Sequence, residues 1–273
     1  MITCDICHHH CRLKEGQVGL CRARMNKEGI NTSINYGRIT SLALDPIEKK
    51  PLYHFYPKSL ILSVGSFGCN FHCPFCQNCE ISMADQSIET VKITPTYLVE
   101  RALELVPRGN IGIAFTYNEP LIGYEFVRDC ANLAKSKGLK TVIVTNGCIS
   151  EKYFKELLPH IDAMNIDLKS FSSDFYKMIG GDLEMVKNSI SLAAPLCHVE
   201  ITTLIIPGEN DSNDEIAALS LWLSSINPEI PLHITRFFPR YKMTDRPPTP
   251  IDKLYSLADT ARKNLRHVYV GNI

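Results

Sequence analysis

The feature that most constrains the fold is a regular alternation of apolar runs and helical patterns, which begins near residue 59 and continues toward the end of the chain. The apolar runs are residues 59–64, 111–117, 139–145, 163–168, 199–206 and 232–237, and the helical patterns are residues 94–106, 119–137, 150–160, 182–195, 212–226 and 250–266. Continuous apolar strands that alternate with helices are typical of a parallel sheet buried on both faces. Six such units predict an α/β fold, a partial TIM-like (β/α)6 barrel, and Val268-Tyr269-Val270 predicts a final short strand.

A doubly wound open sheet is the alternative fold. Its dinucleotide-binding version carries G-x-G-x-x-G after the first strand, and that motif is missing here. A length of 273 residues suits one barrel with a small appendage. We expect residues 1–57 to form a cysteine-rich metal-binding segment followed by a proline-rich lid, and residues 58–273 to form the barrel. The proline-rich stretch 45–57 either packs over the barrel end, which is favoured, or contributes to a substrate pocket.

Composition excludes several classes of protein. The 29 basic and 29 acidic side chains balance, so no net field favours binding to nucleic acid or to an anionic membrane. No apolar run approaches the roughly 20 residues that a membrane helix needs, and no basic-then-apolar signal segment begins the chain. Eleven cysteines without such a segment favour metal chemistry in a reducing compartment over disulfides. We therefore expect a cytoplasmic protein.

Three cysteines follow the first predicted strand. Cys69, Cys73 and Cys76 have the spacing C-x3-C-x2-C. Iron–sulfur clusters are usually held by four thiolates, so three thiolates within eight residues can wrap one cubane cluster and leave its fourth iron open to a small molecule. Gly65 and Gly68 let the backbone turn sharply around such a ligand. A zinc knuckle or three reduced thiols are the less favoured alternatives, since C-x2-C is also common in zinc sites.

A second group of cysteines lies near the N-terminus, where Cys4, Cys7, Cys11 and Cys21 have the spacing C-x2-C-x3-C-x9-C. Four thiolates suit one tetrahedral zinc ion or one cubane cluster. His8, His9 and His10 lie between them and compete as ligands. A short polar segment cannot build an apolar core, so a bound metal would replace one. Structural zinc is narrowly favoured over a second iron–sulfur cluster.

An aromatic residue, Phe75, stands directly before the last cysteine of the first motif. With it, the motif resembles the signature of the radical S-adenosylmethionine (SAM) superfamily. The resemblance implies a radical SAM barrel with a [4Fe–4S] cluster whose open iron binds the amino and carboxylate groups of SAM. One-electron reduction then gives a 5′-deoxyadenosyl radical. The protein positions this cofactor, which carries the chemistry, so no residue is assigned a catalytic role.

Polar residues stand where the second, third and fourth predicted strands end. They are Asn118 and Glu119, Asn146, and Asp167 and Lys169. Ligands of parallel α/β sheets bind at the carboxyl ends of the strands. SAM needs acceptors for its ammonium and ribose hydroxyls and a cation for its carboxylate, and these residue types supply both. Taken singly, each could instead cap a helix or form a turn.

These strand ends also resemble those of activating enzymes of the pyruvate formate-lyase type. Tyr117-Asn118-Glu119-Pro120 takes the place of the family's G-G-E-P, with Asn118 in place of a glycine, and Thr145-Asn146-Gly147 and Asp167-Leu168-Lys169 match its T-N-G and D-L-K motifs. The resemblance implies that Glu119, Asn146, Asp167 and Lys169 contact SAM.

The chain more closely resembles the radical SAM member of the AmmeMemoRadiSam system over nearly its whole length. The shared segments are the N-terminal cysteine pattern, residues 45–54, Cys76-Gln77-Asn78, residues 115–120 and Arg236-Phe237-Phe238-Pro239. Cys79 departs from the tryptophan usual there, and it is interpreted as a helix-face thiol rather than a fourth ligand. Many relatives continue beyond the position of Ile273, so we expect a short or truncated form.

The sequence therefore predicts an oxygen-sensitive radical SAM oxidoreductase that resembles activating enzymes. Its radical would abstract hydrogen from a protein or small-molecule substrate, and the glycine backbone attacked by activases is one option. A low-potential ferredoxin or flavodoxin would supply the electron. A non-catalytic zinc-binding module and a two-cluster electron-transfer protein are the alternatives, and neither has a use for Glu119, Asp167 and Lys169.

Overall fold

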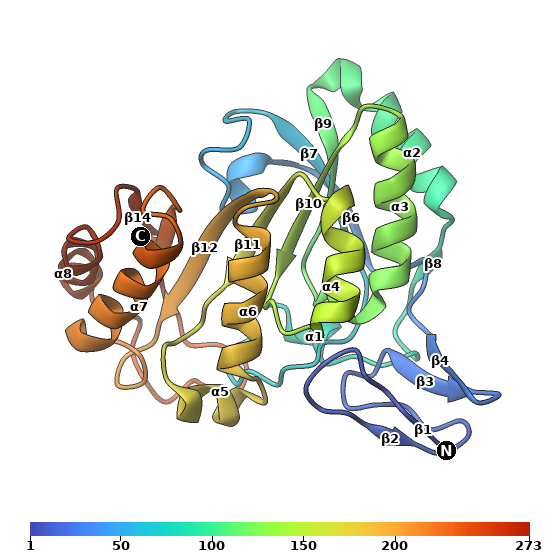
Figure 1. Ribbon diagram of the computed structural model, residues 1–273, viewed down its shortest axis with the longest axis horizontal. Helices are drawn as coiled ribbons and strands as arrows, with labels where there is room; N and C mark the ends of the chain where they lie inside the picture. Colours follow the sequence, from blue (N-terminus) through green and yellow to red (C-terminus); the bar gives the residue numbers. More distant parts are fainter.

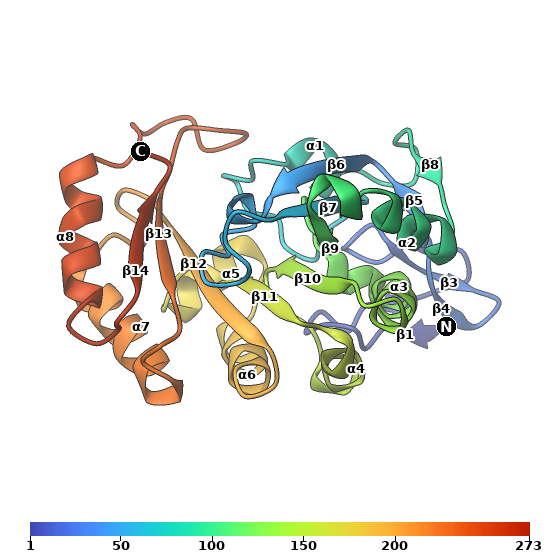
Figure 2. The same cartoon turned by 90° about the horizontal axis from the view of Figure 1, so that it is seen from above.

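The computed structural model describes residues 1–273, and its main feature is an eight-stranded sheet curved into a partial barrel (Figures 1 and 2). The strand order is β14-β13-β12-β11-β10-β9-β7-β6; β6 runs antiparallel to β7, and all other neighbours are parallel. The strands are β6 (Ser41–Pro46), β7 (Leu60–Gly65), β9 (Asn110–Phe115), β10 (Lys140–Thr145), β11 (Ala163–Asp167), β12 (His198–Ile205), β13 (Leu232–Arg236) and β14 (Val268–Gly271). The edge strands β6 and β14 do not pair with each other, so the barrel stays open.

Helices cover the convex face of this sheet (Figure 2). They are α2 (Pro95–Glu104), α3 (Tyr124–Ser136), α4 (Glu151–Leu157), α6 (Leu183–Ala193), α7 (Asn213–Ile226) and α8 (Ile251–Ala261), with 3-10 turns η2 (Val106–Arg108), η3 (Pro120–Gly123) and η4 (Leu158–His160). Each of the six predicted strand–helix units is present, and so is the final short strand. The short helix α1 (Cys79–Ser82) agrees with the interpretation of Cys79 as a helix-face thiol, whereas α5 (Ser173–Ile179) was not predicted.

Side-chain caps begin some of the helices and not others. The hydroxyl of Thr94 accepts a hydrogen bond from the first turn of α2 at 3.2 Å. Ser212 caps α7 in the same way. The hydroxyls of Ser150 and Thr249 bond to distant backbone groups instead of capping α4 and α8. In these two places a tertiary contact takes the hydroxyl that a local cap would use.

The N-terminal segment is built from short antiparallel pairs beside the carboxyl ends of the strands (Figure 1). The pairs are β1 (Ile2–Thr3) with β2 (Arg12–Leu13), β3 (Arg24–Lys27) with β4 (Ile30–Ser33), and β5 (Arg38–Ile39) with β8 (Val91–Lys92). Arg24 is buried and forms a 2.7 Å ion pair with Glu125 of α3, which fixes this segment to the barrel. The predicted boundary at residue 57 stays a prediction; β6, which precedes it, belongs to the large sheet.

The proline-rich stretch after β6 lies within the concave face of the sheet (Figure 2). It begins with the 3-10 turn η1 (Ile47–Lys49). Ile47, Leu52 and Phe55 are buried there in one cluster with side chains from β7, β9, β10 and β11. The cluster shows a packing role inside the curve of the barrel. No helix of the chain combines the length and the apolar character needed to cross a membrane.

Candidate cofactor site

The three-cysteine loop connects the end of β7 to α1, and neighbouring elements shape it closely. Gly68, with φ +88°, has the backbone oxygen of Cys21 2.5 Å from where a Cβ would stand. Only glycine tolerates both this backbone conformation and this approach. The backbone N–H of Cys76 donates to the carbonyl of Cys73 at 3.2 Å, which closes a turn between two of the predicted ligands.

Helix α5 packs against the cysteine loop. The backbone N–H of His72 donates to the carbonyl of Ile179 at 2.9 Å. The rings of Phe71 and Tyr176 pack edge to face with centroids 6.2 Å apart, a favourable arrangement. The sequence does hold a signal for this helix, since Ser172 caps its start and Gly180 ends it in the left-handed conformation.

The thiols of the loop share one electrostatic environment. Burial, followed by the charges of Glu119 and Cys73, raises the pKa of the Cys69 thiol well above its ordinary value. Burial raises the pKa of Cys73 to about 12, although the Lys169 ammonium opposes this. A metal reverses such shifts, because a coordinating thiol is deprotonated outright. No three histidine, cysteine or carboxylate groups are gathered tightly enough for a single ion; a cubane spreads its thiolates over different irons, so the donor set suits a cluster.

Glu119 joins the ends of β9 and β10. Its carboxylate is buried and accepts hydrogen bonds from the Thr145 hydroxyl at 2.7 Å, the Asn146 backbone N–H at 2.7 Å and the Leu121 backbone N–H at 2.9 Å. Burial raises its pKa to about 7, and these donors oppose the shift. The carboxylate is therefore held at one orientation beside the cysteine loop.

Asn118 uses its side chain on the backbone of the cysteine loop. Its oxygen accepts from Ser66 N–H at 2.9 Å, and its amide nitrogen donates to the carbonyls of Phe67 at 3.2 Å and Gly68 at 3.0 Å. These bonds occupy the amide, so what the structure shows for Asn118 is support of the loop. Its contact with a cofactor stays a prediction.

Asn146 extends the network to a cysteine sulfur. Its amide nitrogen lies 2.9 Å from the side-chain oxygen of Asn70 and 3.7 Å from the sulfur of Cys69. Asn70, which the sequence reasoning did not single out, also donates to the carbonyl of Cys148 at 2.8 Å. The position of Asn70 directly after Cys69 was the available signal.

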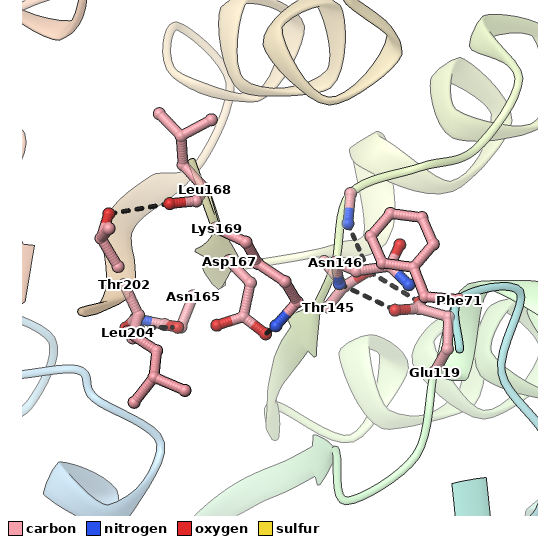
Figure 3. Close-up of polar contacts among 12 residues, drawn as sticks. Phe71, Glu119, Thr145, Asn146, Asn165, Asp167, Leu168, Lys169, Thr202 and Leu204 are labelled. Carbon is pink, nitrogen blue, oxygen red and sulfur yellow. Dashed lines mark hydrogen bonds and ion pairs between the residues drawn. The ribbon is translucent and has the colours of Figure 1, made fainter. Parts of the chain in front are cut away.

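Asp167 and Lys169 form an ion pair of 2.9 Å at the end of β11. Burial lowers the pKa of Lys169, but the charges of Asp167 and Cys73 outweigh it and raise the pKa above its ordinary value, so the ammonium stays charged. Figure 3 shows the pair between Glu119 and Asn146 on one side and Thr202 on the other. All five predicted cofactor-binding residues thus come from neighbouring strand ends at one edge of the sheet.

Two further polar residues face this region and were missed. Asn165, in the middle of β11, accepts a hydrogen bond from the hydroxyl of Thr202 on β12 at 2.9 Å. Both are buried, and they lie beside Asp167 (Figure 3). A polar residue inside an apolar strand run was the signal, because such a residue is costly unless it is paired.

The four N-terminal cysteines line one small cavity, together with His9 and Arg24. Their thiols are not preset at the spacing of a bound ion. Burial raises the pKa of Cys7 to about 12, and the neighbouring cysteines add to the shift. The ring nitrogen Nε2 of His9 lies 2.8 Å from the carbonyl oxygen of Asn70, so this group of cysteines adjoins the three-cysteine loop.

A curved parallel sheet, a three-cysteine loop after its first parallel strand and polar groups at the following strand ends define a metallocofactor-binding α/β barrel. Residues 63–220 match the family model described as the radical SAM superfamily. The chain belongs to this superfamily, and its fold is a radical SAM barrel.

Known proteins agree with this assignment. An uncharacterized protein of Methanocaldococcus jannaschii is 42% identical over 278 residues, which span 100% of this chain and 81% of that protein. A pyruvate formate-lyase-activating enzyme of Clostridium pasteurianum is 30% identical over 58% of this chain and 67% of its own length. The solved structure of Streptococcus suis SuiB bound to S-adenosylmethionine matches with a TM-score of 0.60 and 15% identity, over 78% of this chain and 52% of that one. This last likeness concerns the fold alone.

Proposed function

We propose that the chain is a radical SAM oxidoreductase that cleaves SAM reductively at a [4Fe–4S] cluster held by Cys69, Cys73 and Cys76. The observation that carries the proposal is the meeting of the cysteine loop with the strand-end residues at one sheet edge, where Asn146 lies 3.7 Å from the sulfur of Cys69. When bound, such a cluster supplies an iron that chelates SAM and the electron that splits it to a 5′-deoxyadenosyl radical.

The chain's own residues bind and orient the cofactor. The Lys169 ammonium supplies the cation for the carboxylate of SAM. Asp167 uses one oxygen on Lys169, and its other oxygen is free to accept from a ribose hydroxyl. Glu119 accepts three hydrogen bonds from the protein, and it faces the ammonium of SAM as a buried acceptor. Asn118 keeps the loop in place, and Asn146 donates toward Cys69.

The substrate that would give up a hydrogen atom at this site is a protein or a small molecule. Relatives named as activating enzymes, including the one from Clostridium pasteurianum, support a glycyl-radical activase as the specific candidate. The edge strands β6 and β14 are not paired with each other, and this open side of the sheet supports the approach of a polypeptide segment. The electron comes from a low-potential ferredoxin or flavodoxin, and eleven free cysteines suit an anaerobic, reducing cytoplasm.

We also propose a second metal at Cys4, Cys7, Cys11 and Cys21, either zinc or another iron–sulfur cluster. Their shared cavity supports this. Metal analysis after anaerobic purification separates the two, since zinc adds neither iron nor sulfide. A chain that holds no metal at these cysteines when loaded at the barrel site would refute this part alone.

The test of the main proposal is anaerobic reconstitution with iron and sulfide, followed by an assay for 5′-deoxyadenosine in the presence of SAM and dithionite. Cys73→Ala should lose iron from the barrel site and all cleavage. The matched control is Cys130→Ala, a buried thiol on α3, which should keep both. Cleavage by Cys73→Ala, or none by a fully loaded native protein offered substrate candidates, would overturn the proposal.

A further inference from the structure

The connection from β13 to α8 carries an exposed turn at the same end of the barrel as the cysteine loop. Arg240 and Met243 pair their backbones through two hydrogen bonds of 3.1 Å, which makes a tight turn. Phe237 and Met243 are buried and anchor it. Between them in the sequence, Phe238 and Tyr241 are 46% and 37% exposed, and aromatic side chains are enriched at protein interfaces. We call residues 237–243 the β13–α8 tip.

The tip touches the cysteine loop directly. The backbone N–H of Lys242 donates to the carbonyl of Pro74 at 2.9 Å, and Pro74 stands between Cys73 and Cys76. Figure 2 shows the connection after β13 reaching across the barrel mouth toward α1, where the cysteine loop ends. A protein bound to the tip would therefore stand next to the loop that holds the cluster.

The tip is also positively charged and unneutralised. Arg240 and Lys242 are exposed, and no carboxylate lies within 4.0 Å of either, whereas Arg246 further along pairs with Glu209 at 2.7 Å. Lys242 instead lies over the ring of Tyr241, 5.2 Å from its centroid. The whole chain has no net charge. The positive charge at this surface therefore belongs to the β13–α8 tip and does not reflect a general excess of basic residues.

We propose that the β13–α8 tip is the docking surface for an acidic electron-carrier protein, of the iron–sulfur or flavin type, that reduces the cluster. The inference rests on the proposed function, which requires one external electron. Unpaired cations steer an acidic partner and raise its rate of encounter. Exposed aromatics supply the apolar centre of a contact. Electron-transfer encounters are among the smallest protein interfaces, below roughly 1,200 Å², so a single tip with its surroundings can serve one.

The test compares two reductants on the reconstituted chain: a reduced acidic two-cluster ferredoxin and photoreduced deazaflavin, a small neutral molecule. The variant is the double substitution Arg240→Glu and Lys242→Glu. The matched control is Lys137→Glu with Lys263→Glu, which changes the net charge equally at the opposite end of the strands, where both residues are exposed and follow α3 and α8. Cluster reduction is followed by electron paramagnetic resonance, and ferredoxin binding by fluorescence anisotropy.

The tip variant should bind ferredoxin about tenfold more weakly at low salt and accept its electrons about tenfold more slowly. Its reduction by deazaflavin and its SAM cleavage with deazaflavin should equal those of the native chain. The control variant should behave as native with both reductants. The docking proposal would be overturned if the rate at which ferredoxin reduces the native chain did not fall with rising salt. It would also be overturned if the tip variant bound ferredoxin as tightly as the native chain. Equal slowing with both reductants would also overturn it, because the tip would then act on the cluster itself. Failure of SAM cleavage in all forms would refute the proposed function, while ferredoxin binding and cluster reduction would still test the docking site.

Discussion

Replacing Glu200 by glutamine should destabilise the protein strongly, because this carboxylate is the buried hub that holds the stretch after β6 inside the barrel. It has no exposed surface, and it accepts four hydrogen bonds. The backbone N–H groups of Tyr53 and His54 donate at 3.0 and 2.7 Å, and the Nε2 atoms of His198 and His233 at 2.9 and 2.6 Å. Each carboxylate oxygen receives one backbone donor and one histidine.

A glutamine amide offers only one oxygen, so one backbone N–H would face its NH₂ group. The histidines can change tautomer, but the backbone donor cannot adapt. An unsatisfied buried donor costs about 1–3 kcal/mol. The pKa of Glu200 gives a second figure for the free energy that this carboxylate contributes. Burial raises this pKa, but the hydrogen bonds from the histidines and the backbone outweigh burial and lower it from 4.5 to about 2. A shift of that size corresponds to about 3 kcal/mol of stability.

The pH dependence has a definite sign. A carboxyl group whose pKa is depressed by folding stabilises the protein above its ordinary pKa, and this contribution is lost as pH falls from about 4.5 toward about 2. The native chain should therefore lose about 1.4 kcal/mol of this contribution between pH 7 and pH 3.5, and Glu200→Gln should lose none of it. The difference in stability between the two proteins should narrow by that amount.

Urea unfolding followed by far-ultraviolet circular dichroism at both pH values measures these differences. The matched control is Glu229→Gln, a half-exposed carboxylate paired with Arg266 and His267. An exposed pair is worth under about 1 kcal/mol, so this control should be nearly silent. A Glu200→Gln variant destabilised by less than about 1 kcal/mol at pH 7, or equally at both pH values, would refute the reasoning.

Three further substitutions test the cofactor site. Gly68→Ala should lower the free energy of unfolding by more than about 2 kcal/mol and reduce iron incorporation, because φ is +88° and the new Cβ meets the Cys21 oxygen. The control Gly109→Ala, with φ +90° and open space around it, should lower the free energy of unfolding by only about 1 kcal/mol and keep the iron. Urea unfolding and iron analysis measure the two effects. Lys169→Met should keep the iron but weaken SAM affinity at least tenfold in equilibrium dialysis, since it removes a charge-assisted bond worth about 1.5–3 kcal/mol; unchanged affinity would contradict its role. Cys79→Ala should retain full iron content and SAM cleavage, and loss of iron would make Cys79 a ligand.

The sequence was a good guide where one local rule decides the structure. Alternating apolar strands and helices predicted the barrel, since burial on both faces leaves a parallel strand little choice of composition. The spacing of Cys69, Cys73 and Cys76 placed the loop, and the rule that ligands meet at strand ends brought Glu119 and Asp167 to one edge. These inferences needed only the order of the elements along the chain.

The sequence was a poor guide where a residue's partner lies far away in the chain. The sequence predicts that Asn118 binds the cofactor, yet its side-chain amide donates to the backbone carbonyls of Phe67 and Gly68, 51 and 50 positions earlier. In the sequence, Glu200 is a single carboxylate within the apolar run of β12. Its structural role becomes visible only in the fold, where residues 53, 54 and 233 donate hydrogen bonds to its carboxylate. Helix α5 is short, so its periodicity is weak, and only its cap Ser172 and its terminal Gly180 mark it in the sequence.

Two neighbouring contacts of the stretch after β6 connect the barrel interior to the cysteine loop. Glu200 accepts hydrogen bonds from the backbone N–H groups of Tyr53 and His54. Shortly before them, Lys50 is buried and forms a 2.9 Å ion pair with Asp45, whose carboxylate also accepts a 2.6 Å hydrogen bond from the hydroxyl of Tyr117. Tyr117 has φ +74°, a strained conformation for an aromatic residue, and its carbonyl accepts from Asn78 at 2.8 Å, two positions after Cys76. Strain of this kind persists only when the surroundings hold it. The interior stretch therefore does more than fill space: it fixes the turn from which Glu119 reaches the cofactor edge.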